Sequence, residues 1–250
     1  KGGVGNQLFQ ISTAAAHAAR MNTEIGINYN LPFVAGSLGK HPITYQHTLY
    51  QKISNTNSTP SIKHNEPKFS WDALPEESDM IIDGYFQSDK YFKSCREYIK
   101  SIFTFDLPKA ELKIRSINTP TVIMHIRRGD YLFYDRVYKK YGVDYYLEAL
   151  KYIKEIYCDN FTLLACTDDW QTVRKEFKDF PTFIEVNGRN ELEDLYILSQ
   201  GNYIIGSNST FAWWGAYLGA ESTNIFPGSW FGPDGPADDN DLLPEQWITL

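Results

Sequence analysis

The second half of the chain alternates short apolar segments with longer segments of mixed polarity. The short ones are rich in β-branched residues, as buried strands are, and cover residues 121–126, 161–166, 182–186, 203–206 and 223–226. The longer ones have apolar residues at helical spacing and cover residues 144–157, 169–178, 190–200 and 210–220. Strands alternating with helices form βαβ units. The pattern therefore predicts a Rossmann-like domain with a parallel sheet, from about residue 116 to the end.

The first half of the chain is less regular. Glycines at positions 2, 3 and 5 predict a tight turn into an Ala-rich helix over residues 7–21. Residues 30–80 are rich in Pro, Asn, Ser and Thr, which predicts mainly loops. Residues 83–101 predict a helix at least in part, with Tyr85 and Phe86 entering it. In the second half, Asn190 followed by Glu193 predicts a capping-box start for its helix.

A domain boundary is expected near residues 106–120. Pro108 and Pro120 bracket a stretch rich in Lys and Glu there. We therefore divide the chain into a domain of residues 1–115 and a domain of residues 116–250. Because the sequence begins at Lys1 directly on the glycine turn, we expect that a strand which should precede the turn is missing from it.

Composition and charge narrow the class of protein. The chain has 250 residues, 42% of them hydrophobic and 22% charged, which is typical of a soluble globular protein. Its net charge of −7 argues against nucleic acid or an anionic membrane as the main partner. The three cysteines are isolated, so they indicate a reducing compartment and not a metal or disulfide framework. No apolar run approaches the about 18 residues that span a bilayer.

The segment TVIMHIRRGDY, residues 121–131, points to a ligand. A buried strand ends at His125-Ile126 and is followed by Arg127, Arg128 and Asp130. Ligands of open α/β sheets bind beyond the carboxyl ends of the strands. Paired guanidinium groups suit a phosphate or pyrophosphate, although one of them could simply pair with Asp130 and lock the loop. We expect an anionic substrate that contains a nucleotide.

Three further motifs adjoin predicted strand or helix ends. The turn KGGVGNQ is not a P-loop, because it has Asn6 and Gln7 where a P-loop needs Lys and Ser or Thr. Its glycines predict either a helix N-terminus that binds an anion or a sugar, or only a tight turn. The segment Ser207 to Gly215, SNSTFAWWG, can cap its helix, hold a phosphate, or do both. Asp168 and Asp169 follow a third strand; we expect one to cap the next helix and one to read a nucleotide base. Nothing nearby completes a metal site.

Three blocks together, GGVGNQLFQ, HIRRGDY and SNSTFAWWGAYL, resemble those of family-11 glycosyltransferases, the α-1,2-fucosyltransferases. They occur in the family's order from Gly2 to Leu218. The resemblance implies a GT-B fold, an α/β architecture of two facing Rossmann-like domains with parallel sheets. It further implies inverting, metal-independent transfer of L-fucose from GDP-fucose to the 2-hydroxyl of a terminal β-galactoside, with no cofactor.

The resemblance also implies roles for individual residues. Arg127 and Arg128 fall on the family's arginine pair, at least one of which would contact the pyrophosphate. The remaining binding residues implied are His125, Asp168, Asp169, Asn208, Ser209, Thr210 and Phe211, with Gly3, Asn6 and Gln7 lining the cleft between the domains. Asp130 is the first candidate for a general base and Asp135 the second, although Asp130 could instead orient an arginine.

Other interpretations stay open at this stage. The chain could transfer fucose to another position, use another GDP-sugar, or be an inactive nucleotide-sugar or glycan-binding module. A dinucleotide oxidoreductase fits less well, because KGGVGNQ has the wrong spacing for GxGxxG. A glycan on the sequon at Asn208 would block the proposed site, which favours a cytoplasmic enzyme without an integral membrane segment. Association with a membrane and a lumenal location are left open by the apparently incomplete N-terminus.

Overall fold

The structure is a computed structural model that describes residues 1–34, 39–105, 117–186, 190–219 and 221–250. The chain forms two units, Lys1–Asp106 with Asp238–Pro244, and Leu107–Ala237 with Glu245–Leu250. The predicted boundary between residues 115 and 116 lies outside the described residues. The sequence did not predict that residues 238–244 belong to the first unit.

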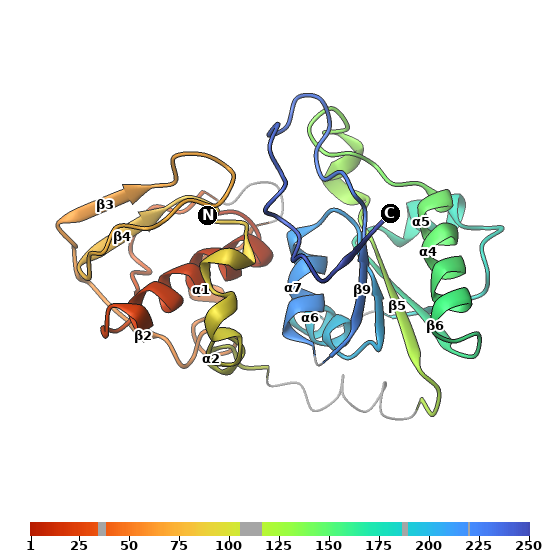
Figure 1. Ribbon diagram of the computed structural model, residues 1–250, viewed down its shortest axis with the longest axis horizontal. Coiled ribbons are helices and arrows are strands. Elements are labelled where there is room, and N and C mark those ends of the chain that lie inside the picture. Colours follow the sequence, from red (N-terminus) through yellow and green to blue (C-terminus); the bar gives the residue numbers. More distant parts are fainter. Residues whose placement is uncertain (35–38, 106–116, 187–189, 220) are drawn as a thin grey trace. The chain divides into compact units, whose positions relative to one another are not determined.

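The second unit is built on a six-stranded parallel sheet with the spatial order β10-β9-β8-β5-β6-β7 (Figure 1). Its strands are β5 (Thr121–Ile126), β6 (Thr162–Thr167), β7 (Ile184–Glu185), β8 (Tyr203–Ile205), β9 (Thr223–Phe226) and β10 (Ile248–Thr249). Numbered along the chain, this is the order 3-2-1-4-5-6 of dinucleotide-binding Rossmann domains. The prediction of a parallel Rossmann-like sheet is confirmed, and β10 is an additional strand.

The predicted helices of this unit are also confirmed. They are α4 (Val143–Ile156), α5 (Trp170–Glu176), α6 (Glu191–Ser199) and α7 (Thr210–Leu218). Asn190 caps α6, since its side chain accepts hydrogen bonds from the N–H groups of Leu192 and Glu193. In Figure 1, α4 and α5 cover one side of the sheet and α6 and α7 the other. All six residues of β5 are buried, as expected for a central strand covered on both faces.

The chain order of the strands creates a switch point between β5 and β8. From β5 the chain continues to β6 and β7 on one side, and it returns to β8 on the other. In doubly wound sheets, ligands bind at the carboxyl ends of the strands at such a switch point. Residues 127–130 and 206–210, which the sequence singled out, lie at these two strand ends.

The first unit contains a long helix and short strands. Gly3 is the N-cap of α1 (Val4–Arg20), which begins three residues earlier than predicted. The described residues contain two two-stranded parallel sheets, one of β1 (Gly26–Ile27) with β2 (Ser54–Asn55) and one of β3 (Ile62–Asn65) with β4 (Met80–Asp83). The remaining elements are η1 (Pro42–Tyr45), η2 (Asp89–Tyr91), η3 (Lys93–Cys95) and α2 (Arg96–Ile102).

The helix predicted over residues 83–101 is wrong in its first half, since Asp83 ends β4 and α2 begins at Arg96. Tyr85 and Phe86 donate their main-chain N–H groups to the Glu66 carboxylate at 2.6 and 2.8 Å. Phe86 is buried and has a φ of 52°, in the left-handed region. A side chain distant in sequence thus holds the chain in a turn here, which local helix propensity does not reveal.

Close packing of α6 against α7 predicts a sharp stability effect at Gly215. A Cβ atom there would lie 2.5 Å from Cβ of Leu198. We expect Gly215→Val to lower the free energy of unfolding by about 1–3 kcal/mol, because the two helices would have to separate. Urea unfolding followed by circular dichroism measures this. Gly228→Ala is the control and should change stability by less than about 0.5 kcal/mol, since its Cβ would make only ordinary contacts, the nearest 3.5 Å from the main-chain oxygen of Leu250. Equal effects at the two positions would contradict the packing interpretation.

Candidate active site

Arg128 is the most deeply buried charged side chain at the end of β5, with a side-chain exposure of 1%. Its Nε donates to Oε2 of Glu176 at 2.6 Å. Its Nη1 and Nη2 donate to the main-chain oxygens of Arg127 and Tyr141 at 2.7 and 3.0 Å. The protein itself therefore holds this guanidinium, and the contact of Arg128 with a phosphate stays a prediction. Of the predicted arginine pair, Arg128 supports the loop.

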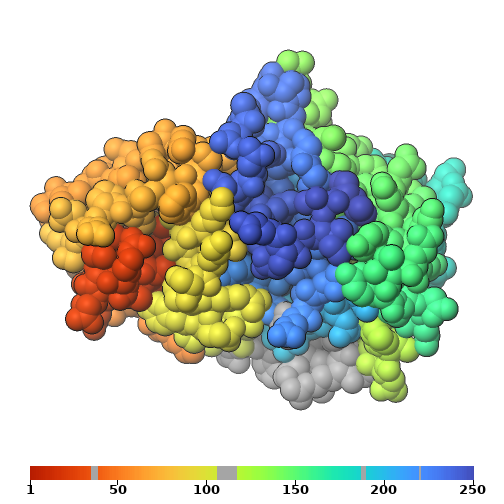
Figure 2. All heavy atoms as spheres, viewed as in Figure 1, coloured from red at the N-terminus to blue at the C-terminus, as the bar shows by residue number. Residues whose placement is uncertain are grey.

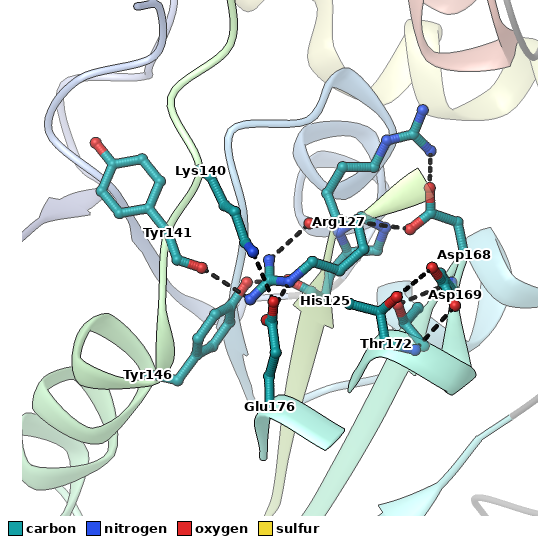
Figure 3. Close-up of polar contacts among 11 residues, drawn as sticks. His125, Arg127, Lys140, Tyr141, Tyr146, Asp168, Asp169, Thr172 and Glu176 are labelled. Carbon is teal, nitrogen blue, oxygen red and sulfur yellow. Dashed lines mark hydrogen bonds and ion pairs between the residues drawn. The ribbon is translucent and has the colours of Figure 1, made fainter. Parts of the chain in front are cut away.

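Glu176 completes the environment of Arg128. Its other oxygen accepts a hydrogen bond from Nζ of Lys140 at 2.6 Å, as Figure 3 shows. Burial acts to raise the pKa of Glu176, but the hydrogen bonds and positive charges of Lys140 and Arg128 outweigh it and lower the pKa. The carboxylate thus stays ionised and compensates the buried guanidinium.

Arg127 is more accessible than Arg128, with 15% of its side chain exposed. Its Nη1 lies 2.8 Å from Oδ2 of Asp168, and its Nη2 donates to Oδ1 of Asp130. Its guanidinium also lies 5.1 Å from the ring centre of Tyr131. The loop lock between an arginine and Asp130 is therefore present. Arg127 remains the arginine of the pair that a phosphate could reach.

The two acids that follow β6 have separate tasks. Asp169 caps α5, since it accepts hydrogen bonds from N–H and Oγ1 of Thr172 at 3.0 and 2.6 Å (Figure 3). Asp168 accepts the main-chain N–H of Arg128 at 2.8 Å in addition to its pair with Arg127. A Cβ atom on Gly129 would lie 2.2 Å from Oδ2 of Asp168, so only glycine permits this approach. The predicted helix cap is confirmed for Asp169, and Asp168 binds the loop that carries the two arginines. A hydrogen bond from a nucleotide base to Asp168 stays a prediction.

His125 is buried and neutral. Its Nδ1 lies 2.8 Å from Oγ of Ser207, and its ring centre lies 5.6 Å from that of Phe211. Burial, and secondarily the charge of Arg127, lowers the pKa of His125 from 6.5 to about 3. His125 therefore links the ends of β5 and β8 by a hydrogen bond and carries no charge near neutral pH.

The segment after β8 combines support with accessible donors. Asn208 is buried, and its Nδ2 donates to the main-chain oxygens of Lys139 and Trp230 at 2.8 and 2.6 Å. Ser209 is the N-cap of α7 but makes no side-chain hydrogen bond to the helix. In the described part of the chain, the hydroxyls of Ser209 and Thr210 have no hydrogen-bond partner. The start of α7 thus offers free hydroxyls at the positive end of a helix dipole.

The glycine turn of the first unit is supported in a similar way. Gln7 is buried; its Nε2 donates to the main-chain oxygens of Gly2 and Lys40, and its Oε1 accepts from Tyr50. Its side chain therefore supports the turn, and its predicted role in ligand binding stays a prediction. Asn6 is partly exposed and accepts a hydrogen bond from Nε2 of Gln87 at 2.8 Å. Gly3 leaves open space where a Cβ would be.

Some supporting residues escaped sequence reasoning. Glu176 lies 48 positions beyond Arg128 on a helix whose other residues give no hint of the contact. Tyr131 directly follows the arginine motif, and this proximity could have identified it as a supporting residue. Its hydroxyl donates to the main-chain oxygen of Asn208 at 2.7 Å, so it joins the loops that follow β5 and β8.

Two kinds of feature are absent from the described residues. No group of three or more His, Cys, Asp and Glu side chains is arranged to hold a metal ion among them. Within the same residues, no helix is both long and apolar enough to cross a membrane.

The whole chain, residues 1–250, matches the model of glycosyl transferase family 11. The protein belongs to this family. An Alpha-1,2-colitosyltransferase from Escherichia coli is 25% identical over 100% of this chain and 96% of the relative. A Galactoside 2-alpha-L-fucosyltransferase from Caenorhabditis elegans is 24% identical over 90% of this chain and 69% of the relative. The chain is thus a glycosyltransferase of the fucosyltransferase type.

Solved structures support the fold. The α-1,6-fucosyltransferase NodZ, in crystals soaked with GDP-fucose, is similar to this chain with a TM-score of 0.52. The similarity covers 88% of this chain and 90% of NodZ at 13% sequence identity. At this identity the likeness concerns the fold, which is of the GT-B type, as expected from the resemblance of the three sequence blocks.

The contrast between the two arginines predicts different effects on stability. Arg128→Met should lower the free energy of unfolding by about 3 kcal/mol or more, because it removes a buried cation from its carboxylate and carbonyl partners. Arg127→Gln should cost less than this, because its side chain is 15% exposed and the glutamine amide can still donate to Asp130 or Asp168. Urea unfolding of both variants tests this. A large loss for Arg127→Gln with none for Arg128→Met would contradict the assignment of supporting and accessible arginine.

The buried histidine predicts a component of acid sensitivity. Between pH 6.5 and about 3 the unfolded chain binds a proton at His125 that the folded chain does not, so stability falls as pH falls through this window. The slope from this group reaches about 1.4 kcal/mol per pH unit. Urea unfolding at several pH values should show that His125→Phe loses this slope, whatever its absolute stability. The exposed His47, replaced by Gln, is the control and should retain the slope.

Proposed function

We propose that the protein transfers L-fucose from GDP-fucose to the 2-hydroxyl of a terminal β-galactoside, with inversion and without a metal. The observation that carries the proposal is the placement of Arg127 and the free start of α7 at the switch point between β5 and β8. Both offer hydrogen-bond donors with positive charge or a positive dipole end. A diphosphate requires such donors, and Rossmann domains bind nucleotides at this point.

The charge on the leaving group explains why these donors matter. When the bond from the sugar C1 to the β-phosphate oxygen breaks, negative charge develops on GDP. Arg127 would neutralise it by exchanging its contact with Asp130 for the phosphate, while Asp168 keeps the guanidinium in place. The hydroxyls of Ser209 and Thr210 would donate to the phosphate from the start of α7. Preorganised donors of this kind stabilise the transition state without rearranging solvent.

Attack by the acceptor completes the proposed sugar transfer. The acceptor hydroxyl attacks C1 from the face opposite GDP, so the new glycosidic bond forms with inversion. Its proton passes to a base, for which Asp130 is the first candidate and Asp135 the second. Release of Asp130 from Arg127 on donor binding would free its carboxylate for this task. Both relatives act at position 2 according to their names, which supports the proposed linkage.

A second donor is supported by one observation. The α-1,2-colitosyltransferase matches this chain along its whole length. Colitose is fucose without its 3-hydroxyl, so a site that hydrogen-bonds this hydroxyl would reject GDP-colitose strongly. Competition between GDP-fucose, GDP-colitose and GDP-mannose in one reaction identifies the donor by the sugar found in the product.

The decisive experiment is GDP release from GDP-fucose in excess EDTA, with and without lactose as a terminal β-galactoside. We expect lactose to stimulate release, and the product should carry fucose at position 2 of galactose. Release that requires a divalent cation would refute the metal-independent mechanism. A protein that binds GDP but transfers no sugar from any of the three donors would be a nucleotide-sugar-binding module.

A matched set of variants tests the site itself. Arg127→Gln should lower turnover by about 100- to 1,000-fold, because it removes one charged donor from the leaving group. The control Arg174→Gln removes an exposed arginine that pairs with Glu185, and it should leave turnover unchanged. Similar losses in both variants would mean that overall charge, and not the site, is responsible.

A further inference from the structure

The loop after the arginine motif exposes apolar side chains in sequence. Leu132, Phe133 and Tyr134 are 39%, 83% and 52% exposed. Within the described residues the rings of Phe133 and Tyr134 have no aromatic partner. They begin three residues after Asp130, whose carboxylate pairs with Arg127. Exposed aromatic side chains beside a reactive site are a mark of ligand binding.

The loop that carries these rings is firmly supported. Tyr131 stacks on Tyr138 with ring centres 4.4 Å apart and planes 6° from parallel. Tyr138 forms an antiparallel bridge with Phe231, and Asp234 accepts two hydrogen bonds from the Arg136 guanidinium at 2.6 and 2.8 Å. Figure 1 shows the light-green chain after β5 beside the blue segment that provides these partners, and Figure 2 shows green and blue atoms of this region at the surface. Phe133 and Tyr134 thus project from a preorganised loop.

We propose that Phe133 and Tyr134 form the acceptor subsite, where their rings stack on the apolar face of the acceptor galactose. This inference rests on the proposed function and assigns it an acceptor-binding surface. A β-galactose ring presents several C–H groups on one face and hydroxyls at its edge. Aromatic rings match the first, and the carboxylates of Asp130 and Asp135, which flank the aromatic residues in the sequence, match the second.

The size and charge of this surface favour a sugar over other partners. A stable protein interface needs about 20–30 residues on each side, whereas these are three neighbouring side chains. An anionic bilayer would be repelled by Asp130 and Asp135 and by the net charge of −7. A single neutral pyranose ring fits the area of one or two aromatic rings and places its hydroxyls near the carboxylates.

The test is steady-state kinetics with GDP-fucose and lactose. The double variant with Phe133→Ala and Tyr134→Ala should raise KM for lactose at least about 10-fold, since both stacking surfaces are lost. KM for GDP-fucose should change much less, because the nucleotide site lies at the β5–β8 switch point. The single variant Phe133→Tyr keeps an aromatic ring at this position, so its KM for lactose should stay close to that of the unaltered protein. Ile156→Ala removes another exposed apolar side chain of the same unit and serves as the control.

Saturation-transfer NMR of lactose with the GDP-bound protein separates this inference from the proposed function. Transfer from aromatic protons to the galactose ring should be seen in the unaltered protein and lost in the double variant. Fucose transfer with an unchanged KM for lactose in the double variant would overturn the subsite while leaving the function intact. Loss of binding to anionic vesicles with unchanged lactose kinetics would overturn it in favour of a membrane contact. If lactose shows ring contacts but no donor gives transfer, the proposed function fails and the sugar subsite stands.

Discussion

The site depends on one buried cation, the guanidinium of Arg128. Moving such a charge out of water is costly unless a carboxylate and further acceptors surround it. Glu176 and the main-chain oxygens of Arg127 and Tyr141 provide this environment. The contacts with Glu176 and Tyr141 tie two other segments to the end of β5, so the loop that begins there has little freedom. Arg127 is thereby held in place at the end of β5.

Further hydrogen bonds extend this rigidity to the loop after β8. His125 reaches Ser207, Tyr131 reaches the main chain of Asn208, and Asn208 reaches two other loops. Most of the polar side chains in the family motifs therefore bind protein. The few that remain accessible, Arg127 and the hydroxyls at the start of α7, owe their positions to this network. A site that relies on preorganised charge is expected to have many supporting side chains for each side chain that contacts a ligand.

The pairing of Arg127 with Asp130 couples the two halves of the proposed reaction. While the pair is intact, the arginine is neutralised and the carboxylate is engaged. A bound diphosphate would compete for the arginine and so prepare the carboxylate for the acceptor proton. Asp168 prevents the guanidinium from moving away in the exchange, and Gly129 allows Asp168 to come this close. The aromatic side chains that follow lie on the same loop, so the proposed acceptor subsite would adjoin this exchange.

The sequence by itself determined the Rossmann-like second unit, because strand and helix periodicities and the N-cap at Asn190 are local properties. It also located the two segments at the switch point, since residues 127–130 and 207–210 follow the buried runs of β5 and β8. Tertiary structure decided which side chains there are accessible. Arg127 and Arg128 are adjacent and chemically identical, but only contacts with Glu176 and Tyr141, distant in sequence, bury one of them. The turn at Phe86 was decided in the same way, because the Glu66 carboxylate that holds it lies 20 residues earlier, directly after β3.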